Sequence, residues 1–361
     1  MGLPELTFTL TQAAETAAAR LYSGNVALIL RDAKANGVYT IHRESDFPAG
    51  LGAANADYLR RAMIGSINRP AVLYAAVIPT AGKIADGFGL LSTYDYDYLA
   101  GPPDISAEDA AALGKLVSAQ HKKRYVGKVV LPETAADSPC VVNFSASGIQ
   151  AGGTTFTAGQ YASRIAGVLA GTPVECSATG SELPEVTAVD AVSAPDAAVD
   201  AGKLILVDDG RRVILGRAVT SKVTLQKGEP AALKKIKLVG ALDLIRHYAI
   251  TTVEDEYLGK CPNTYDNKCI LISALRDYLQ ELDRLGILEP GTWKAELDAE
   301  AIRAYLIQRA TDAGDLTEVQ RIKELSDKAL QKEPTDSRVF VRLSGMILDS
   351  MEDFGIVFET R

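Results

Sequence analysis

Both ends of the chain carry the alternation of apolar and polar residues that is typical of β-strands. This period of two places the apolar side chains of each segment on one face. The apolar members are Leu6, Phe8 and Leu10 near the start and Phe354, Ile356 and Phe358 near the end. A strand at the end of a chain either folds back onto its own sheet or pairs with a neighbouring subunit. Because both ends show the pattern, we expect a subunit that joins its neighbours through its ends.

Between residues 22 and 146, short apolar runs alternate with segments of helical periodicity. Such alternation predicts an α/β domain with a doubly wound, largely parallel sheet. The predicted strands are Val26–Leu30, Ala71–Ile78, Asp97–Ala100, Val126–Leu131 and Cys140–Phe144. The predicted helices are Asn55–Ile64, Lys83–Leu91 and Ala107–Tyr125.

A glycine-rich stretch at 148–153 predicts a domain boundary, and helical patterns dominate beyond it. The predicted helices are Thr157–Ala170, a short turn at Asp196–Ala201, Lys234–Leu285 with an interruption near Gly259–Asn263, Glu296–Gln308 and the amphipathic Leu316–Lys332. The extended segments are Pro184–Val189, a hairpin of Leu204–Val207 with Arg212–Val219, then Arg338–Leu348 and Phe354–Phe358. The Asp-Gly pair at 209–210 is a strong signal for that hairpin.

The fold class that follows is α/β in the first domain and α+β overall. We expect an N-terminal arm at 1–21, the α/β domain at 22–146, a core domain at 147–350 and a C-terminal arm strand at 351–361.

Composition narrows the functional classes. The chain has 361 residues, is 47% hydrophobic and 23% charged, and has a formal net charge of −8. An acidic chain of this kind is not expected to bind nucleic acid, which requires a basic face. No apolar run approaches the roughly 20 residues that cross a bilayer, and the start of the chain lacks the pattern of a signal peptide. We therefore expect neither membrane insertion nor general secretion.

No motif in the chain predicts catalysis or a cofactor. Gly87-Phe-Gly89 lies inside a helical pattern, whereas a dinucleotide fingerprint sits at a strand-to-helix turn. The carboxylates of the 94–98 segment lack the spacing of a calcium loop, and the acidic cluster 254–256 is better explained by salt bridges than by acid–base chemistry. The four cysteines are scattered, without the paired spacing of a zinc site. We expect no enzyme, no metal and no cofactor.

Several stretches in order along the chain resemble the contractile tail sheath proteins of myophages and R-type bacteriocins, most closely the diffocin-type sheaths. They are Gly2–Phe8, Val26–Ala33, Tyr161–Thr172, Ala201–Leu206, Gly216–Ser221, Lys234–Val239, Asp243–Arg246, Tyr257–Lys268 and Leu348–Asp353. The chain lacks the long outer insertion that large phage sheaths carry.

The resemblance implies a structural subunit of a sixfold helical sleeve around a tail tube, with baseplate and tail-terminator proteins at its ends. In this family the terminal arms complete the sheets of neighbouring subunits, and the sleeve shortens to drive the tube through a target envelope. It also implies assembly in the bacterial cytoplasm and release by lysis. Whether the particle is a phage or a headless bacteriocin is left open.

By its position before the last strands, the Leu316–Lys332 segment resembles the family's tube-attachment helix. Its cations, Arg321, Lys323, Lys328 and Lys332, could meet acidic residues of the tube. An ordinary amphipathic surface helix would show the same pattern, so both interpretations stand. Two other classes of protein also remain: another phage-like scaffold, such as a tube or shell protein, and an α/β enzyme.

Overall fold

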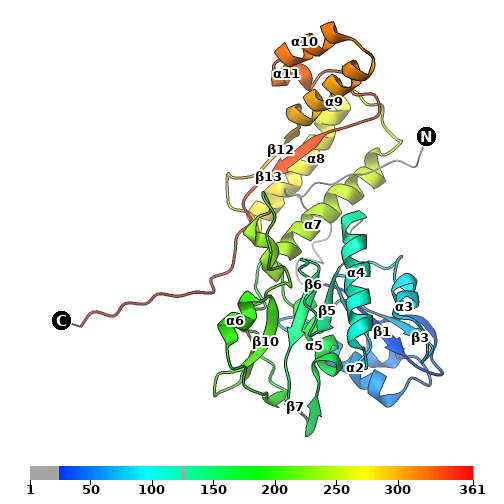
Figure 1. The fold of residues 1–361 in the computed structure, drawn as a ribbon, viewed down its shortest axis with the longest axis vertical. Coiled ribbons are helices and arrows are strands. Elements are labelled where there is room, and N and C mark those ends of the chain that lie inside the picture. The colour runs from blue at the N-terminus through cyan, green and yellow to red at the C-terminus, as the bar shows by residue number, and fades with distance from the viewer. Residues whose placement is uncertain (1–23, 124–126, 361) are drawn as a thin grey trace. The chain divides into compact units, whose positions relative to one another are not determined.

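The computed structural model describes residues 24–123 and 127–360 (Figure 1). They form two compact units. The first, called the sheet unit here, holds residues 24–240 together with 349–360. The second, called the helical unit, is Ala241–Leu348. The division falls inside one helix, α7 (Ile236–Thr252).

The sheet unit is built on an eight-stranded sheet whose order is β11-β10-β6-β5-β4-β1-β3-β2. The strands are β11 (Val213–Leu215), β10 (Lys203–Asp208), β6 (Val141–Ser145), β5 (Lys128–Pro132), β4 (Tyr98–Ala100), β1 (Val26–Arg31), β3 (Leu73–Ile78) and β2 (Gly37–Ile41). Neighbouring strands from β10 through β3 are parallel, and the edge strands β11 and β2 are antiparallel to their neighbours. This confirms the predicted α/β class with a largely parallel sheet.

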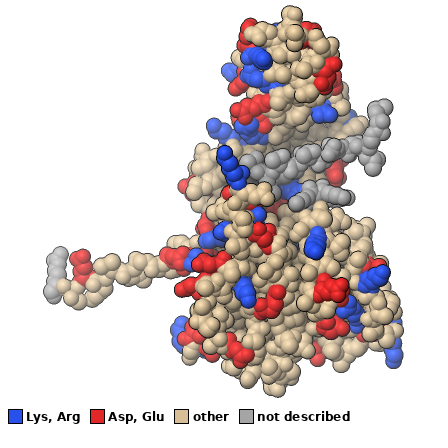
Figure 2. Space-filling view, viewed as in Figure 1, with Lys and Arg blue, Asp and Glu red and all other residues tan. Residues whose placement is uncertain are grey.

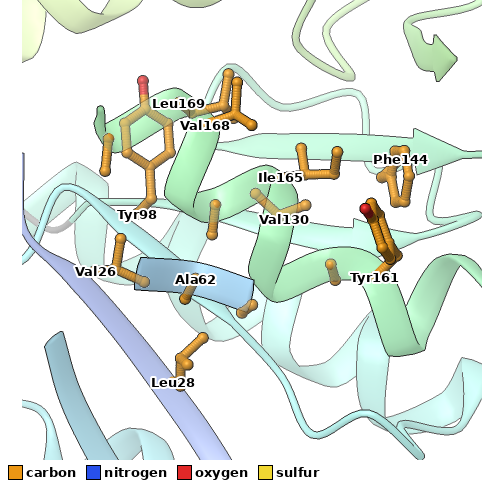
Figure 3. Close-up of a cluster of buried hydrophobic side chains, with 14 of the residues drawn as sticks. Val26, Leu28, Ala62, Tyr98, Val130, Phe144, Tyr161, Ile165, Val168 and Leu169 are labelled. Atoms are coloured by element: carbon orange, nitrogen blue, oxygen red, sulfur yellow. The ribbon is translucent and has the colours of Figure 1, made fainter. Parts of the chain in front are cut away.

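Helices cover both faces of this sheet, which is why its strands are apolar almost throughout. On one face, α2 (Ala53–Ile64) and α5 (Ala158–Ala170) pack on side chains such as Val26 and Leu28 (Figure 3). On the other face, α3 (Ile84–Leu90) and α4 (Ala107–Lys123) pack on Ala27 and Ile29. Alternate residues of one strand therefore enter separate cores, and the predicted double winding is present.

Helix α5 carries the Tyr161–Thr172 stretch of the family resemblance, and packing explains its composition. Gly167 lies so close to α2 that a Cβ there would be 2.1 Å from the carbonyl oxygen of Ala62. Arg164 is fully buried and donates from Nε to Glu185 Oε1 at 2.6 Å and from NH1 to the Gly65 carbonyl at 2.5 Å. Both residues therefore serve to hold the helix in place.

The glycine-rich stretch is a hairpin turn inside the sheet unit. Gly152 and Gly153 both have positive φ and join β7 (Ile149–Ala151) to β8 (Thr154–Phe156), and β9 (Val186–Ala188) completes this three-stranded sheet. Because β10 pairs with β6 across the predicted boundary at 146/147, the large sheet is continuous there. The compact units instead divide between residues 240 and 241. The predicted arms, 1–21 and 351–361, stay predictions.

The helical unit contains most of α7, a π-helical turn and four further helices. They are Val253–Tyr257, α8 (Tyr265–Arg284), α9 (Ala299–Asp312), α10 (Leu316–Glu324) and α11 (Asp327–Leu330). A two-stranded antiparallel sheet joins β12 (Lys294–Leu297) to β13 (Val341–Ser344). The interruption predicted near Gly259–Asn263 is present between α7 and α8.

Three of the predicted elements differ in the structure, and strands β2, β7 and β8 were not predicted. The single helix expected at Leu316–Lys332 is two, because Leu325 is extended and Arg303 donates to the carbonyl oxygen of Lys323 at 3.0 Å, where α10 ends. The helix expected from Glu296 begins at Ala299, because the preceding residues form β12. The strand expected at Phe354–Phe358 has no regular secondary structure in this single chain. Three short helices complete the described structure: Glu44–Asp46, α6 (Pro195–Asp200) and Ala231–Lys234.

Candidate assembly surfaces

The segment that precedes the predicted C-terminal strand is bound to the sheet unit by charge. We call residues 349–353 the anchor. Lys235 donates to Asp349 Oδ2 at 2.6 Å and to Glu352 Oε2 at 3.0 Å. Arg217 forms a close ion pair with Asp353, and Lys237 donates to Ser350 Oγ at 3.0 Å. The anchor therefore has a defined position on the sheet unit.

Glu352 is the most enclosed residue of the anchor, with its side chain only 5% exposed. Besides Lys235, it accepts from Ser177 Oγ and Thr179 Oγ1, both at 2.8 Å. Burial by itself would raise the pKa of Glu352, but the bonds from Ser177, Lys235 and Thr179 outweigh it and lower the pKa below its usual value. The carboxylate is thus held in its charged form by the hydrogen-bond donors that surround it.

The sequence analysis did not predict this site, although the stretches that contain its residues were identified. Arg217, Lys235 and Glu352 each lie in a different stretch that carries the family resemblance. No local pattern joins them, because the contacts between Lys235 and Glu352 span 117 positions of the chain. The one local signal for this site is the cluster of acidic residues at 349–353, which directly precedes the apolar residues 354–358.

Beyond the anchor, the chain leaves the body with its apolar side chains in solvent. We call residues 354–358 the apolar tail. Phe354, Ile356 and Phe358 are 71%, 88% and 86% exposed. Figure 2 shows this part of the chain as an uncharged stretch that runs outward from acidic residues of the anchor. Consecutive exposed large apolar residues are uncommon in a soluble chain and mark a surface that a partner covers.

The predicted N-terminal strand residues, Leu6, Phe8 and Leu10, lie outside the described residues. Their pairing with a neighbour stays a prediction.

The four cations of the predicted tube-facing helix are placed unequally. Arg321 is bonded within the helical unit to Glu318 at 2.7 Å and to Glu333 at 2.9 Å, and the bonds with Glu318 and Glu333 raise its pKa. Lys332 Nζ lies 5.6 Å from the ring centroid of Tyr265. Lys323 on α10 and Lys328 on α11 are exposed, and neither has an ion pair among residues 24–123 and 127–360. Of the four, these two are available to a partner.

The predicted apolar stripe of that helix is only partly a packing surface. Ile322 is fully buried, whereas Leu316 is 78% exposed at the first turn of α10. Leu316 therefore adds an apolar contact to the surface on which Lys323 lies.

In doubly wound folds, ligands bind at the carboxyl ends of the strands where the strand order reverses, which here is between β1 and β4. Arg31 ends β1 and is bound to Asp109 at 2.5 Å. Asp32 accepts from the Gly52 N–H at 2.8 Å and the Lys34 N–H at 2.9 Å, bonds that lower its pKa to about 2. Arg31 and Asp32 are therefore engaged in holding helix α4 and two loops in place, and neither of these two side chains is free for a ligand.

Within the described part of the chain, no group of three or more His, Cys, Asp or Glu residues is arranged to hold a metal ion. Among the helices it contains, none is long and apolar enough to span a membrane.

Comparison with known proteins identifies this architecture. The sheath tail proteins of Listeria innocua and Desulfitobacterium hafniense share the fold, each with a TM-score of 0.64, at 13% and 14% identity, over 80% and 79% of this chain and 90% and 92% of theirs. A chain of the anti-feeding prophage baseplate matches with a TM-score of 0.67 and 14% identity over 100% of this chain and 98% of that one. The fold is therefore that of sheath proteins.

The sequence gives the family directly. The tail sheath protein of Clostridium phage phiCD119 is 30% identical over 364 residues, which cover 98% of both chains. No family model matches the chain. This chain belongs to the tail sheath proteins. It is a structural subunit, and because the relatives are structural sheath proteins, the enzyme alternative is set aside.

Proposed function

We propose that this subunit polymerises as stacked hexameric rings around a tail tube and that the resulting sleeve contracts to drive the tube through a target cell envelope. The observation that carries the proposal is the exposed apolar tail next to an ordered anchor. A strand donated to a neighbour gains main-chain hydrogen bonds and buries its apolar face. Because the contact joins different surfaces of two copies, it is heterologous, and such contacts generate a ring where the rotation closes and a helix where it does not.

The β12–β13 sheet is the acceptor we propose for donated strands. A two-stranded sheet is marginal by itself and gains most from added strands. The outer side of β12 is occupied, because the carbonyl oxygens of Ala295 and Leu297 accept from Arg276 Nε at 2.9 Å and Gln331 Nε2 at 3.2 Å. The outer edge of β13 has no further strand partner among the described residues. A donated strand would therefore extend the sheet at β13.

The outer edge of the large sheet at β11 is a poorer acceptor. Leu183 N–H donates to the Val213 carbonyl at 3.0 Å, and Leu215 N–H donates to the Ser181 carbonyl at 2.8 Å. A segment of the same chain thus already satisfies this edge.

Each donated strand is a weak link by itself. Each of Phe354, Ile356 and Phe358 gains about 1.5–3 kcal/mol on burial, and each hydrogen bond nets about 0.5–1.5 kcal/mol. Ordering the tail costs about 1–2 kcal/mol per residue. These contributions nearly cancel, so the sleeve gains its strength from repetition, and a free subunit stays monomeric.

Contraction follows if the arms keep subunits connected while their folded bodies move between two packings. The extended sleeve would be metastable, held by contacts to the tube and by a kinetic barrier. We further propose baseplate and tail-terminator proteins as partners at the ends of the sleeve, and a role within a phage tail or diffocin-like particle that is assembled in the cytoplasm and released by lysis. Contacts with nucleic acid or membrane are not part of the proposal.

Truncation tests the tail. A chain that ends at Asp353 should remain a folded monomer with unchanged thermal unfolding, and it should form no sleeves by negative-stain electron microscopy. Val357→Ser is the matched control, since Val357 lies on the opposite side of the proposed strand from Phe354, Ile356 and Phe358.

Deletion of residues 1–11 tests the N-terminal arm in the same way. Normal sleeves from either truncated chain would refute the role of that arm.

A further inference from the structure

A cavity of about 530 Å³ in the sheet unit is lined by residues of α6 and of the β10–β11 hairpin. Figure 1 shows α6 beside β10. Its lining is mainly aliphatic and includes Val199, Ile205, Val207, Ile214 and Leu215. Val199, Val207 and Ile214 are only partly buried, so the cavity presents apolar surface to solvent. The volume falls in the range of about 300–1,000 Å³ that is typical of ligand pockets. We call this cavity the α6 groove.

The α6 groove and the anchor share two side chains. Thr179 and Arg217 line the groove. Thr179 Oγ1 donates to Glu352 Oε1 at 2.8 Å, and Arg217 forms a close ion pair with Asp353. Phe354 is the next residue, and its Cα lies about 3.8 Å from that of Asp353. The first aromatic side chain of the apolar tail therefore directly follows a residue that is paired with a side chain of the groove lining.

We propose that in the unassembled subunit the α6 groove receives Phe354 of its own chain and releases it when a neighbouring subunit takes the tail. The structure records the open arrangement, with Phe354 71% exposed. For the ring to enter the groove, the backbone after Asp353 would rotate while the anchor stays bound. Docking buries the ring and part of the aliphatic lining, at the cost of ordering one or two residues.

The tether favours the chain's own tail over that of a second copy. A segment joined by a short linker is present at an effective concentration on the order of millimolar, far above that of free subunits in dilute solution. The groove would thus hide the tail from premature strand pairing, which exposed apolar strands otherwise promote. This consequence for assembly rests on the proposed function, whereas the docking itself can be measured on the monomer.

Photo-crosslinking on the full-length monomer tests the docking. A benzophenone side chain replaces Phe354, the protein is irradiated at low concentration, and crosslinked peptides are assigned by mass spectrometry. We expect crosslinks within one chain to the peptides 195–200 and 205–217, and a several-fold loss of these crosslinks in the Val199→Glu background. The same probe at Met351, which is 86% exposed, should not label the groove.

Three outcomes would overturn the proposal: equal labelling of the groove from positions 351 and 354, crosslinks only between chains, or yields that Val199→Glu leaves unchanged. A second measurement follows assembly by light scattering. Val199→Glu should shorten the lag before sleeves form, relative to Val223→Glu, an exposed valine outside the groove. An unchanged lag would refute the sequestering role.

Failure of all variants to assemble would count against the proposed function. In that case the crosslinking result alone would test whether Phe354 docks in the groove.

Discussion

Arg164 Nε and Glu185 Oε1 lie 2.6 Å apart, and they differ sharply in exposure: the arginine side chain is 2% exposed and the glutamate 28%. The guanidinium is held by this carboxylate and by the Gly65 carbonyl, and the Tyr161 hydroxyl also donates to Glu185 at 2.7 Å. The pair joins α5 to the loop after α2 and to the segment before β9.

Glu185→Ala should therefore destabilise the sheet unit strongly. The variant leaves a buried cation without its carboxylate, which typically costs about 3–5 kcal/mol. Urea unfolding followed by circular dichroism measures the loss. Arg60→Ala is the control, because Arg60 forms its ion pairs with Glu44 and Asp57 in solvent, and the variant should change stability little. Equal small effects from both variants would show that the Arg164 pair is not structural.

Two glycines should respond to alanine with opposite signs. Gly167→Ala places a methyl group 2.1 Å from the Ala62 carbonyl oxygen, so α5 must move away from α2, at a cost of about 1–3 kcal/mol or more. Gly89, in helix α3, has nothing within 4 Å of its would-be Cβ, and Gly89→Ala should stabilise by about 0.5–1 kcal/mol. Thermal unfolding compares them, and a stable Gly167→Ala variant would contradict the packing described.

Asp32 should make stability fall in acid. Its folded pKa of about 2 lies below the usual value of 3.8, so it contributes stability above pH 4 that is lost as the pH falls toward 2. Asp32→Asn should lower the free energy of unfolding at pH 7 by at most about 2 kcal/mol and flatten its dependence on pH between 4 and 2. Glu175→Gln, at an exposed residue, serves as control; an unchanged pH profile for Asp32→Asn would argue against the loop-fixing role.

The anchor should open when Glu352 loses its charge. Docking lowers the pKa of Glu352 below its ordinary value of 4.5. The anchor is therefore fully stabilised above pH 4.5 and is weakened as the pH falls through the lowered pKa. Glu352→Gln imitates the protonated state at neutral pH and should cost the segment about 1–3 kcal/mol. Hydrogen exchange of residues 349–353 reports this as a roughly tenfold or greater loss of protection, while Glu359→Gln should leave exchange unchanged.

Charge reversal separates the two interpretations of α10 and α11. Lys323→Glu with Lys328→Glu should reduce extended assembly around tubes, most clearly at low salt, where exposed charges are least screened. Lys34→Glu with Lys83→Glu, at exposed lysines of the sheet unit, is the control pair. Arg321→Glu is not informative, since it disrupts the bonds to Glu318 and Glu333. If the Lys323→Glu and Lys328→Glu variant assembles normally, the interpretation of these helices as an ordinary protein surface is favoured.

The local sequence pattern was sufficient to predict the elements that are buried between apolar neighbours on both faces. The apolar runs Val26–Leu30 and Ala71–Ile78 predicted β1 and β3 to within two residues, and Thr157 caps α5 where the sequence predicted its start. The local pattern was insufficient where a residue or strand far away in the sequence determines the secondary structure. Residues 294–297 consist largely of helix-forming types, yet they form β12 because β13 lies alongside. The continuity of the large sheet past residue 146 likewise depends on β10 pairing with β6, which no local signal contains.

The candidate assembly surfaces divide in the same way. The alternation of Phe354, Ile356 and Phe358 marks an apolar strand-like segment, and its exposure agrees with a partner outside the chain. The carboxylate site of Glu352 was not predictable, since Ser177, Thr179 and Lys235 come from separate parts of the sequence. The split of the predicted helix at Leu325 depends on Arg303 from α9, another contact at a distance.

In the sleeve proposed above, the pairing of Asp353 with Arg217 would also limit how far the apolar tail can reach. Five residues in extended conformation span at most about 18 Å, so any groove or strand edge that receives Phe358 must lie within that radius of Asp353. If the sleeve contracts as proposed, both of its packings must keep the donor and the acceptor strand within this distance. The length of the tail beyond Asp353 would then limit how far neighbouring subunits can slide and remain joined.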